Sequence, residues 1–239
     1  MGITLPQSLS ELNLLRRQFG IADDFAAFSS GGVWTDTSPD SGAAVNGGDG
    51  LGGRVTLATG ATDNNECYLH STRELFLFSP QRPIVFEARV QYAEANVDDA
   101  NVCLGLMDAV GADALVDNGG GPKASYSGML FYKVDGETVW QAESSVGSSQ
   151  TTTVLSATGA LDRRAHAAVG SVFETYRIEF RPLTTTEAEI CFFLNDVHVA
   201  KHLISYSGAT EMQALIGVKA GGANSEQVVV DYVSCLQVR

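Results

Sequence analysis

Apolar residues recur at every second position from residue 84 to residue 92. Ile84, Phe86, Ala88, Val90 and Tyr92 fall on one face of an extended chain, and the residues between them fall on the other. Because successive side chains of a β-strand point to opposite faces, the pattern predicts a strand with one buried and one solvent-facing side. Such a strand needs a second layer of structure to cover its apolar face.

Similar strand-like runs recur along the rest of the chain with almost no helical interruption. They cover residues 54–59, 67–70, 102–107, 129–134, 138–142, 176–180, 190–194 and 228–238. Asp135-Gly136 and Asn195-Asp196 separate neighbouring runs and are typical of tight hairpin turns. Residues 25–53 are rich in Gly, Ser, Asp and Asn, which predicts irregular surface structure with at most one short strand. We therefore expect an all-β fold, an antiparallel jelly-roll β-sandwich over residues 25–239.

The first residues, 1–24, are predicted to form an N-terminal arm with one short amphipathic helix. Ser8 and Glu11 have capping-box spacing, and Gly20 suits the position after a helix, which predicts a helix over residues 8–19. Its apolar stripe consists of Leu9, Leu12, Leu15 and Phe19. An isolated helix of this length is marginal in water, so the stripe must dock, either on its own sandwich or on a neighbouring subunit or capsid.

The charge balance excludes several classes of partner. Lys and Arg total 15 against 28 Asp and Glu, a formal charge of −13. This field repels phosphate backbones and anionic lipid surfaces, and the densest basic groups are only Arg16-Arg17 and Arg163-Arg164. No apolar run approaches the roughly 20 residues that span a bilayer, and no leader peptide is recognisable. We expect no nucleic acid and no membrane partner.

The C-terminal part of the chain carries a recognisable order of segments. Residues 175–180 form one strand-like run, 190–196 a hairpin-like run, and 229–233 a run containing Asp231-Tyr232-Val233. This order resembles the concanavalin A-like lectin and glucanase (LamG-like) superfamily. The resemblance implies the jelly-roll fold, and because a fold hosts many functions it implies no particular activity.

A second resemblance rests on residues 98–108 and 128–136 with the polar run 144–153. These segments look like structural proteins of tailed bacteriophages that decorate the head. The resemblance implies a non-enzymatic virion protein, a capsid decoration or cement protein on the capsid exterior, made in the host cytoplasm. Its partner would be the major capsid protein. A homo-oligomer, with a trimer as one option, would multiply weak contacts.

No catalytic residues and no cofactor are predicted. Glucanases of the superfamily carry a Glu-x-Asp-x-Glu string on one strand, and the nearest acidic spacing here is Glu187-Ala188-Glu189 beside a hairpin. His198 and His202 would share a face of a strand and could host a metal, but surface histidines are the favoured interpretation, so no metal site is predicted. The four cysteines favour buried free thiols, with a Cys191–Cys235 bridge as the alternative.

Loops offer the remaining candidate site. Possible glycan or calcium ligands are Asp98, Asp99, Asn101, Asp117 and Asn118. Carboxylate and amide oxygens suit calcium, although Asp and Asn also fill turns for conformational reasons. The alternative to capsid decoration is therefore a lectin-like carbohydrate-binding module. Trp34 and Trp140 are interpreted as core anchors rather than sugar platforms.

Overall fold

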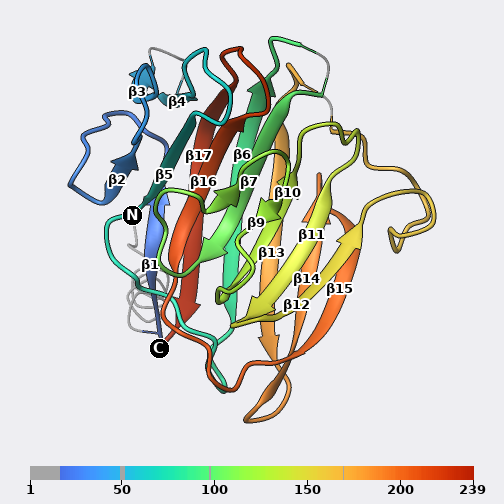
Figure 1. Ribbon diagram of the computed structural model, residues 1–239. Coiled ribbons are helices and arrows are strands. Elements are labelled where there is room, and N and C mark those ends of the chain that lie inside the picture. Colours follow the sequence, from blue (N-terminus) through green and yellow to red (C-terminus); the bar gives the residue numbers. More distant parts are fainter. Residues whose placement is uncertain (1–16, 49–51, 97, 169) are drawn as a thin grey trace, which may run out of the picture.

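The computed structural model describes residues 17–48, 52–96, 98–168 and 170–239. Its named elements are all β-strands, arranged in two large antiparallel sheets that form a sandwich (Figure 1). The two-sheet, all-β prediction is confirmed and is consistent with a jelly roll. No helix among the described residues is long and apolar enough to cross a membrane.

Sheet A contains the first and last described strands. From one edge its order is β15 (Val197–Ser205), β14 (Glu187–Leu194), β13 (Glu174–Pro182), β6 (Ile84–Ala93), β17 (Gln227–Val238), β4 (Arg54–Ala58) and β3 (Ala44–Gly48). Strand β1 (Gln18–Asp23) pairs with the C-terminal half of β17, beside the position of β4 on its N-terminal half. The buried and exposed residues of β6 alternate as its sequence predicts.

Sheet B lies against sheet A. Its order is β12 (Ser149–Val154), β11 (Gln141–Val146), β10 (Gly128–Lys133), β7 (Ala100–Met107), β16 (Gln213–Ala220), β5 (Glu66–Ser71) and β2 (Trp34–Thr37). Between β7 and β10, residues 108–127 leave the sheet and include the small pair β8 (Leu115–Val116) and β9 (Gly121–Pro122). We call residues 108–127 the strap.

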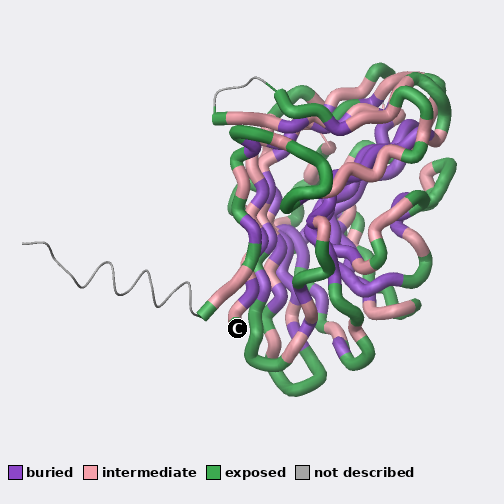
Figure 2. Tube along the Cα trace, turned by 90° about the vertical axis from the view of Figure 1, so that its left-hand side faces the viewer, coloured by how far each residue is buried: buried purple, intermediate pink, exposed green. Residues whose placement is uncertain are grey.

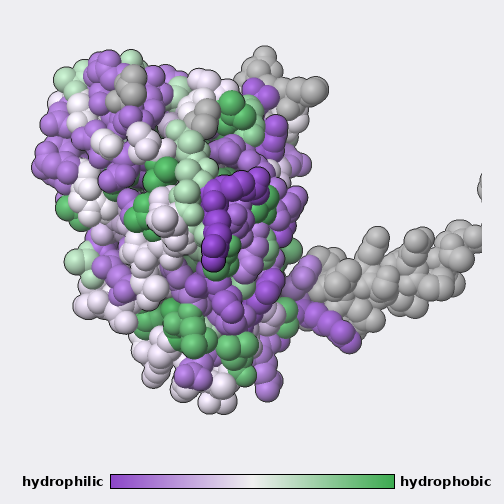
Figure 3. All heavy atoms as spheres, turned by 90° about the vertical axis from the view of Figure 1, so that its right-hand side faces the viewer, coloured by the Kyte–Doolittle hydropathy of each residue, from purple (hydrophilic) through white to green (hydrophobic). Residues whose placement is uncertain are grey.

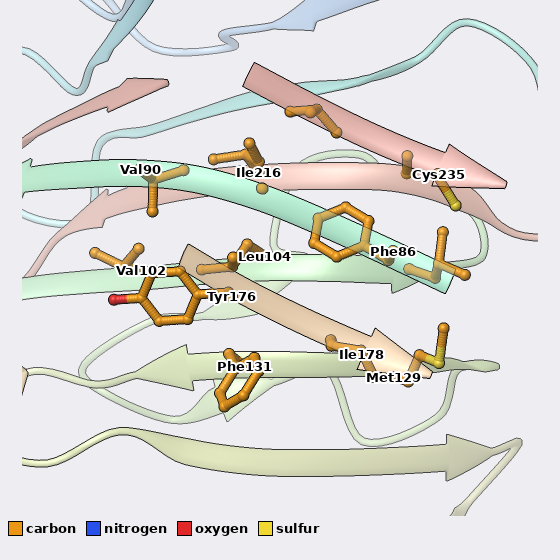
Figure 4. Packing of buried hydrophobic residues seen from close by; sticks show 14 of the residues in the cluster. Phe86, Val90, Val102, Leu104, Met129, Phe131, Tyr176, Ile178, Ile216 and Cys235 are labelled. Carbon is orange, nitrogen blue, oxygen red and sulfur yellow. The ribbon is translucent and has the colours of Figure 1, made fainter. Parts of the chain in front are cut away.

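The main core fills the space between the two sheets. Phe86 and Ile178 of sheet A meet Leu104, Phe131 and neighbouring apolar residues of sheet B (Figure 4). Buried segments run through both sheets, while exposed ones gather at the turns (Figure 2). This interdigitation buries the apolar face that each alternating strand carries.

The two tryptophans lie in this core, as predicted. Trp140 is fully buried and packs edge-on against Tyr92 and Tyr176. Trp34 is 3% exposed, and its indole N–H donates to Asp23 at 2.9 Å. Neither ring offers a platform for a sugar.

The predicted helix over residues 8–19 is wrong at its C-terminal end. Phe19 lies in β1, where its ring stacks on Phe76 with centroids 6.1 Å apart and packs against the core of its own sandwich. Phe19 fits both a helical and an alternating pattern, so its spacing alone does not distinguish a helix from a strand. Leu9, Leu12 and Leu15 lie outside the described residues.

Other segments also differ from their predictions. Residues 25–53 contribute two short strands, β2 and β3, instead of one. Residues 138–140 precede β11, with Val139 forming only an isolated bridge to Ala167. The turn at Asn195-Asp196 is confirmed: both residues have positive φ, 48° and 63°, as the common two-residue hairpin turn requires.

Candidate functional site

The strap covers the outer face of sheet B and creates a second apolar core there. Ala114, Leu115 and Tyr126 of the strap are about 1% exposed. Beneath them lie residues of the sheet: Tyr68, Cys103, Met107, Leu130, Tyr132, Val134 and Leu215. The strap passes over the face of sheet B that points away from sheet A (Figure 1), and apolar side chains are packed between the two.

A buried lysine holds the strap to the sheet. Lys219 of β16 is 1% exposed, and its ammonium group lies 3.3 Å from Glu66 Oε2, 3.0 Å from Asp113 Oδ1 and 3.0 Å from the carbonyl of Leu115, with Asp117 as a further partner. Burial alone would lower the pKa of Lys219, but hydrogen bonds to Asp117 and Asp113 and the charge of Glu66 raise it above its usual value. Lys219 therefore remains charged inside the molecule.

Two glutamates lie on the same outer face, and both are fully engaged. Glu66 of β5 accepts the hydroxyl of Tyr68 at 2.6 Å and the backbone N–H of Asp113 at 2.9 Å. Glu143 of β11 accepts the hydroxyls of Tyr126 at 2.8 Å and Thr152 at 2.5 Å. Both carboxylates are nearly inaccessible, at 3% and 4% exposure.

The spacing of these glutamates does not suit glycoside hydrolysis. Their strands, β5 and β11, are separated by β16, β7 and β10. At about 4.8 Å between neighbouring strands, the strands that carry the two carboxylates lie about 19 Å apart. Glycosidases hold their acid and base or nucleophile about 5–9.5 Å apart. Glu187 and Glu189 lie elsewhere, on β14 of sheet A, where Glu189 pairs with Lys201 at 2.9 Å.

The only hydrogen bond between a serine hydroxyl and a histidine ring within the described ranges is also buried. Ser144 Oγ lies 2.9 Å from His202 Nδ1, and the other ring nitrogen bonds Thr153 Oγ1 at 3.0 Å rather than a carboxylate. Burial lowers the pKa of His202 to about 4, so the ring is neutral at pH 7. With His202 only 3% exposed, this pair cannot reach a substrate.

The predicted shared face of His198 and His202 is wrong. A bulge between Phe192 and Phe193 shifts the register of β14 against β15. His202 consequently pairs with core-facing Ile190, whereas His198 stacks on Phe193 on the other side of the sheet. Within the described residues, no group of three or more His, Cys, Asp and Glu side chains is arranged to hold a metal ion.

The predicted loop residues do gather at one end of sheet B. Asn101 Oδ1 accepts the N–H of Asp135 at 2.9 Å, and its amide donates to the carbonyl of Lys219 at 3.3 Å. Asp117 pairs with Lys219, and the carbonyl of Asp99 accepts the N–H of Gly221 at 2.8 Å. We call this region the acidic end.

Backbone hydrogen bonds hold the remaining two loop residues at the acidic end. The carbonyl of Asp98 accepts the N–H of Gly136 at 2.9 Å, and the N–H of Asn118 donates to Asn64 Oδ1 at 3.0 Å. Both residues have positive φ, 63° and 56°, which Asp and Asn tolerate better than most side chains. Their presence is thus explained in part by the turns they form.

Sequence reasoning missed the buried cations of this end. Lys133 is fully buried and donates to Glu94 at 2.8 Å and to the carbonyls of Asp98 and Ala100, which fixes the crossing from β6 to β7. Lys219 interrupts the otherwise uncharged run of β16. A single lysine within a buried strand pattern is the signal that would have indicated an internal ion pair.

A separate hollow of about 360 Å³ lies beside the turn between β14 and β15. Its polar lining is Arg164, His166, Glu174 and Asn195. Asp162 binds both His166 and Arg164, and these hydrogen bonds outweigh burial and lower the pKa of Asp162 to about 2. Glu174 accepts from Asn195 at 3.1 Å, so the polar groups of the hollow largely satisfy one another.

The Cys191–Cys235 bridge, considered as the alternative to free thiols, does not form. All four cysteines are free and buried, and the strands of Cys191 and Cys235, β14 and β17, are separated by β13 and β6. Burial raises the pKa of each thiol, that of Cys67 to about 11. The prediction of buried free thiols is confirmed.

Comparison with known proteins supports the fold alone. No family model and no curated protein sequence matches the chain. Among solved structures, a protein of unknown function from Shewanella oneidensis MR-1 superimposes with a TM-score of 0.60 at 12% identity, over 100% of this chain and 96% of that one. An endo-1,3-β-glucanase from Streptomyces sioyaensis gives 0.60 at 15% identity, over 92% and 96%.

Lectins are similar to the same degree. Peanut lectin with a nine-residue peptide gives a TM-score of 0.59 at 9% identity, over 92% of this chain and 97% of that one. The neighbours thus have the concanavalin A-like lectin and glucanase jelly-roll fold. They include both an enzyme and a lectin, so they distinguish no activity for this chain.

Proposed function

We propose that this protein is a non-enzymatic structural component of a virion, a decoration protein that binds the outside of a tailed-phage head and stabilises the capsid lattice. Its principal partner in this role is the major capsid protein. The observation that carries the non-enzymatic part is the strap-covered outer face of sheet B. The virion part rests on the sequence segments at residues 98–108 and 128–136 that resemble phage head proteins.

The strap argues against catalysis on geometric grounds. A glycosidase needs two carboxylates that reach the same bond and a groove that admits a chain of sugars. Here Glu66 and Glu143 are buried and hydrogen-bonded, and their strands lie about 19 Å apart. A sandwich of this kind can still act through its ends, edges and terminal arm.

Strand β1, at the end of the proposed arm, is held in place by side-chain contacts. Phe19 is held by Phe76, and the guanidinium of Arg239 lies 5.6 Å from the centre of the Phe19 ring. Strand β1, which follows the proposed arm in the sequence, is therefore fixed to sheet A. Many weak contacts, repeated over a symmetric shell, add up through avidity.

The direct test is binding to undecorated phage heads. Full-length protein is expected to saturate the head exterior in cosedimentation and in electron cryomicroscopy maps. A variant that lacks residues 1–16 keeps β1 and is expected to lose most of its occupancy. A matched variant, L9S/L12S/L15S, keeps the arm's length and removes only its apolar stripe, and it should behave like the truncation. Failure of the full-length protein to bind heads would refute the proposal.

A lectin-like binding module is the second candidate, favoured by the gathering of Asp99, Asn101 and Asp117 at the acidic end. A glycan array with and without a chelator tests it, with Asp99→Asn as the site variant. Saturable sugar binding that the chelator and the variant both abolish would favour this candidate over decoration.

A further inference from the structure

Strand β12 forms an open edge of sheet B. Within the described ranges it pairs with β11 alone, and its register against that strand is continuous from Ser149 to Val154. Every residue of β12 except Thr153 is exposed. An edge strand presents a row of unpaired N–H and C=O groups, which is a template for pairing with another strand.

The other edge strands carry features that discourage such pairing. Strand β15 has Lys201 at its centre and a bulge in its pairing with β14. Strand β2 has four residues and includes Asp36, while β3 ends in two glycines. Strand β1 has Gly20 in its middle. Charges, bulges, glycines and short length are the usual means of protecting an edge, and β12 has none of them.

The sequence around β12 is also unusual in its charge. Residues 144–161 form the longest stretch of the chain without Asp, Glu, Lys or Arg, although the chain as a whole carries −13. Two copies of so acidic a molecule repel each other over most of their surfaces. A contact between copies is least disfavoured where charge is missing. The side that bears β12 and β15 faces the viewer in Figure 3, where neutral and apolar areas interrupt the hydrophilic surface.

We propose that β12 pairs antiparallel with β12 of a second copy, so that two B sheets join into one continuous sheet. A twofold axis through Thr151 places this residue opposite Thr151 of the partner subunit and Gln150 opposite Thr152 of the partner subunit. Thr–Thr pairs across antiparallel strands are favourable, and no like charges meet. The same operation on β15 would place Lys201 opposite the partner's Lys201, which selects β12 as the pairing edge.

This dimer follows from the edge itself and is independent of the virion role proposed above. The interface is isologous, as a twofold contact requires, because the same strand serves on both sides.

Sedimentation velocity over a concentration series tests the pairing. The full chain is expected to be a dimer, and Thr151→Lys, which sets two lysines beside the twofold axis, is expected to be a monomer with an unchanged circular dichroism spectrum. Ser205→Lys, at an exposed edge position of β15, is the matched control and should remain a dimer. A wild-type chain that is monomeric at every concentration, or a Thr151→Lys variant that dimerises as wild type does, would overturn the proposal.

Hydrogen exchange keeps the test decisive if the lysine variant does not fold. In the wild-type chain the β12 amides should exchange more slowly at high protein concentration than at low concentration, while those of β15 should not change. A dimer whose β12 amides exchange as fast as in the monomer would show that another surface makes the contact.

Discussion

Replacing Lys219 with methionine is expected to release the strap from sheet B. Methionine fills a similar volume but removes the charge that Glu66, Asp113 and Asp117 share. Asp113 and Asp117 are 68% and 51% exposed, so water replaces the lysine for them. Glu66, at 4% side-chain exposure, is the carboxylate left without a counter-charge inside the protein.

The expected loss of stability comes from leaving the Glu66 carboxylate without a counter-charge. Removing one partner of a buried ion pair costs about 3–5 kcal/mol of stability. Glu66 keeps hydrogen bonds from the Tyr68 hydroxyl and the Asp113 N–H, which places Lys219→Met near the lower end, at about 3 kcal/mol. The double variant K219M/E66Q should recover part of the loss, because an amide at position 66 carries no charge to desolvate.

Urea denaturation followed by circular dichroism measures the loss, and hydrogen exchange of residues 108–127 measures the opening of the strap. The control is Lys201→Met, which removes a solvent-exposed lysine from its pair with Glu189 and should leave both readouts unchanged. If Lys219→Met costs less than about 1 kcal/mol, the value typical of surface pairs, or leaves strap exchange as it is, the view of Lys219 as the anchor is wrong.

Three further outcomes are expected. Burial lowers the pKa of His202 from 6.5 to about 4, so the folded state should lose about 3 kcal/mol of stability as pH falls from 6.5 toward 4. In urea titrations His202→Gln should show a shallower decline of stability with pH than the wild type. Equal declines would contradict this. Iodoacetamide should label no cysteine of the native protein and all four after denaturation without reductant, as mass spectrometry would reveal. Gly217→Ala should cost about 1–3 kcal/mol, because the new Cβ would lie 2.3 Å from the Tyr68 ring, and an unchanged melting temperature would count against that packing.

The strands that can be predicted from the sequence are those with one face in solvent. Strand β6 shows period-two alternation because its outer face meets solvent, and the structure keeps that pattern from Ile84 to Ala93. Strand β12 was not predicted as a strand, since Ser149–Val154 has almost no apolar face to alternate. Strand β1 was missed because Phe19 also satisfies helical spacing.

The candidate site was predictable in its location but not in its bonding. Asp98, Asn101 and Asp117 flank strand ends that antiparallel topology brings to one end of sheet B. Their counter-charge, Lys219, comes from a strand more than a hundred residues away from Asp117, and the pairing of β16 with β7 is what joins them. A single bulge likewise put His198 and His202 on opposite faces, because a one-residue shift in register inverts the side on which every later residue points.

The strap also changes which surfaces of this fold are exposed for binding. Without the strap, Tyr68, Glu66 and Glu143 on the outer face of sheet B would be in solvent, and Glu143 would lose its contact with Tyr126. A surface of such side chains is typical of one that binds polar ligands. Covering it with residues 108–127 buries those same side chains, at the cost of desolvating two carboxylates and one lysine. Glu66 then pairs with Lys219, and Glu143 accepts the hydroxyls of Tyr126 and Thr152. With that face occupied, the exposed surfaces that remain for interaction include the acidic end, the outer face of sheet A and the uncharged edge of β12.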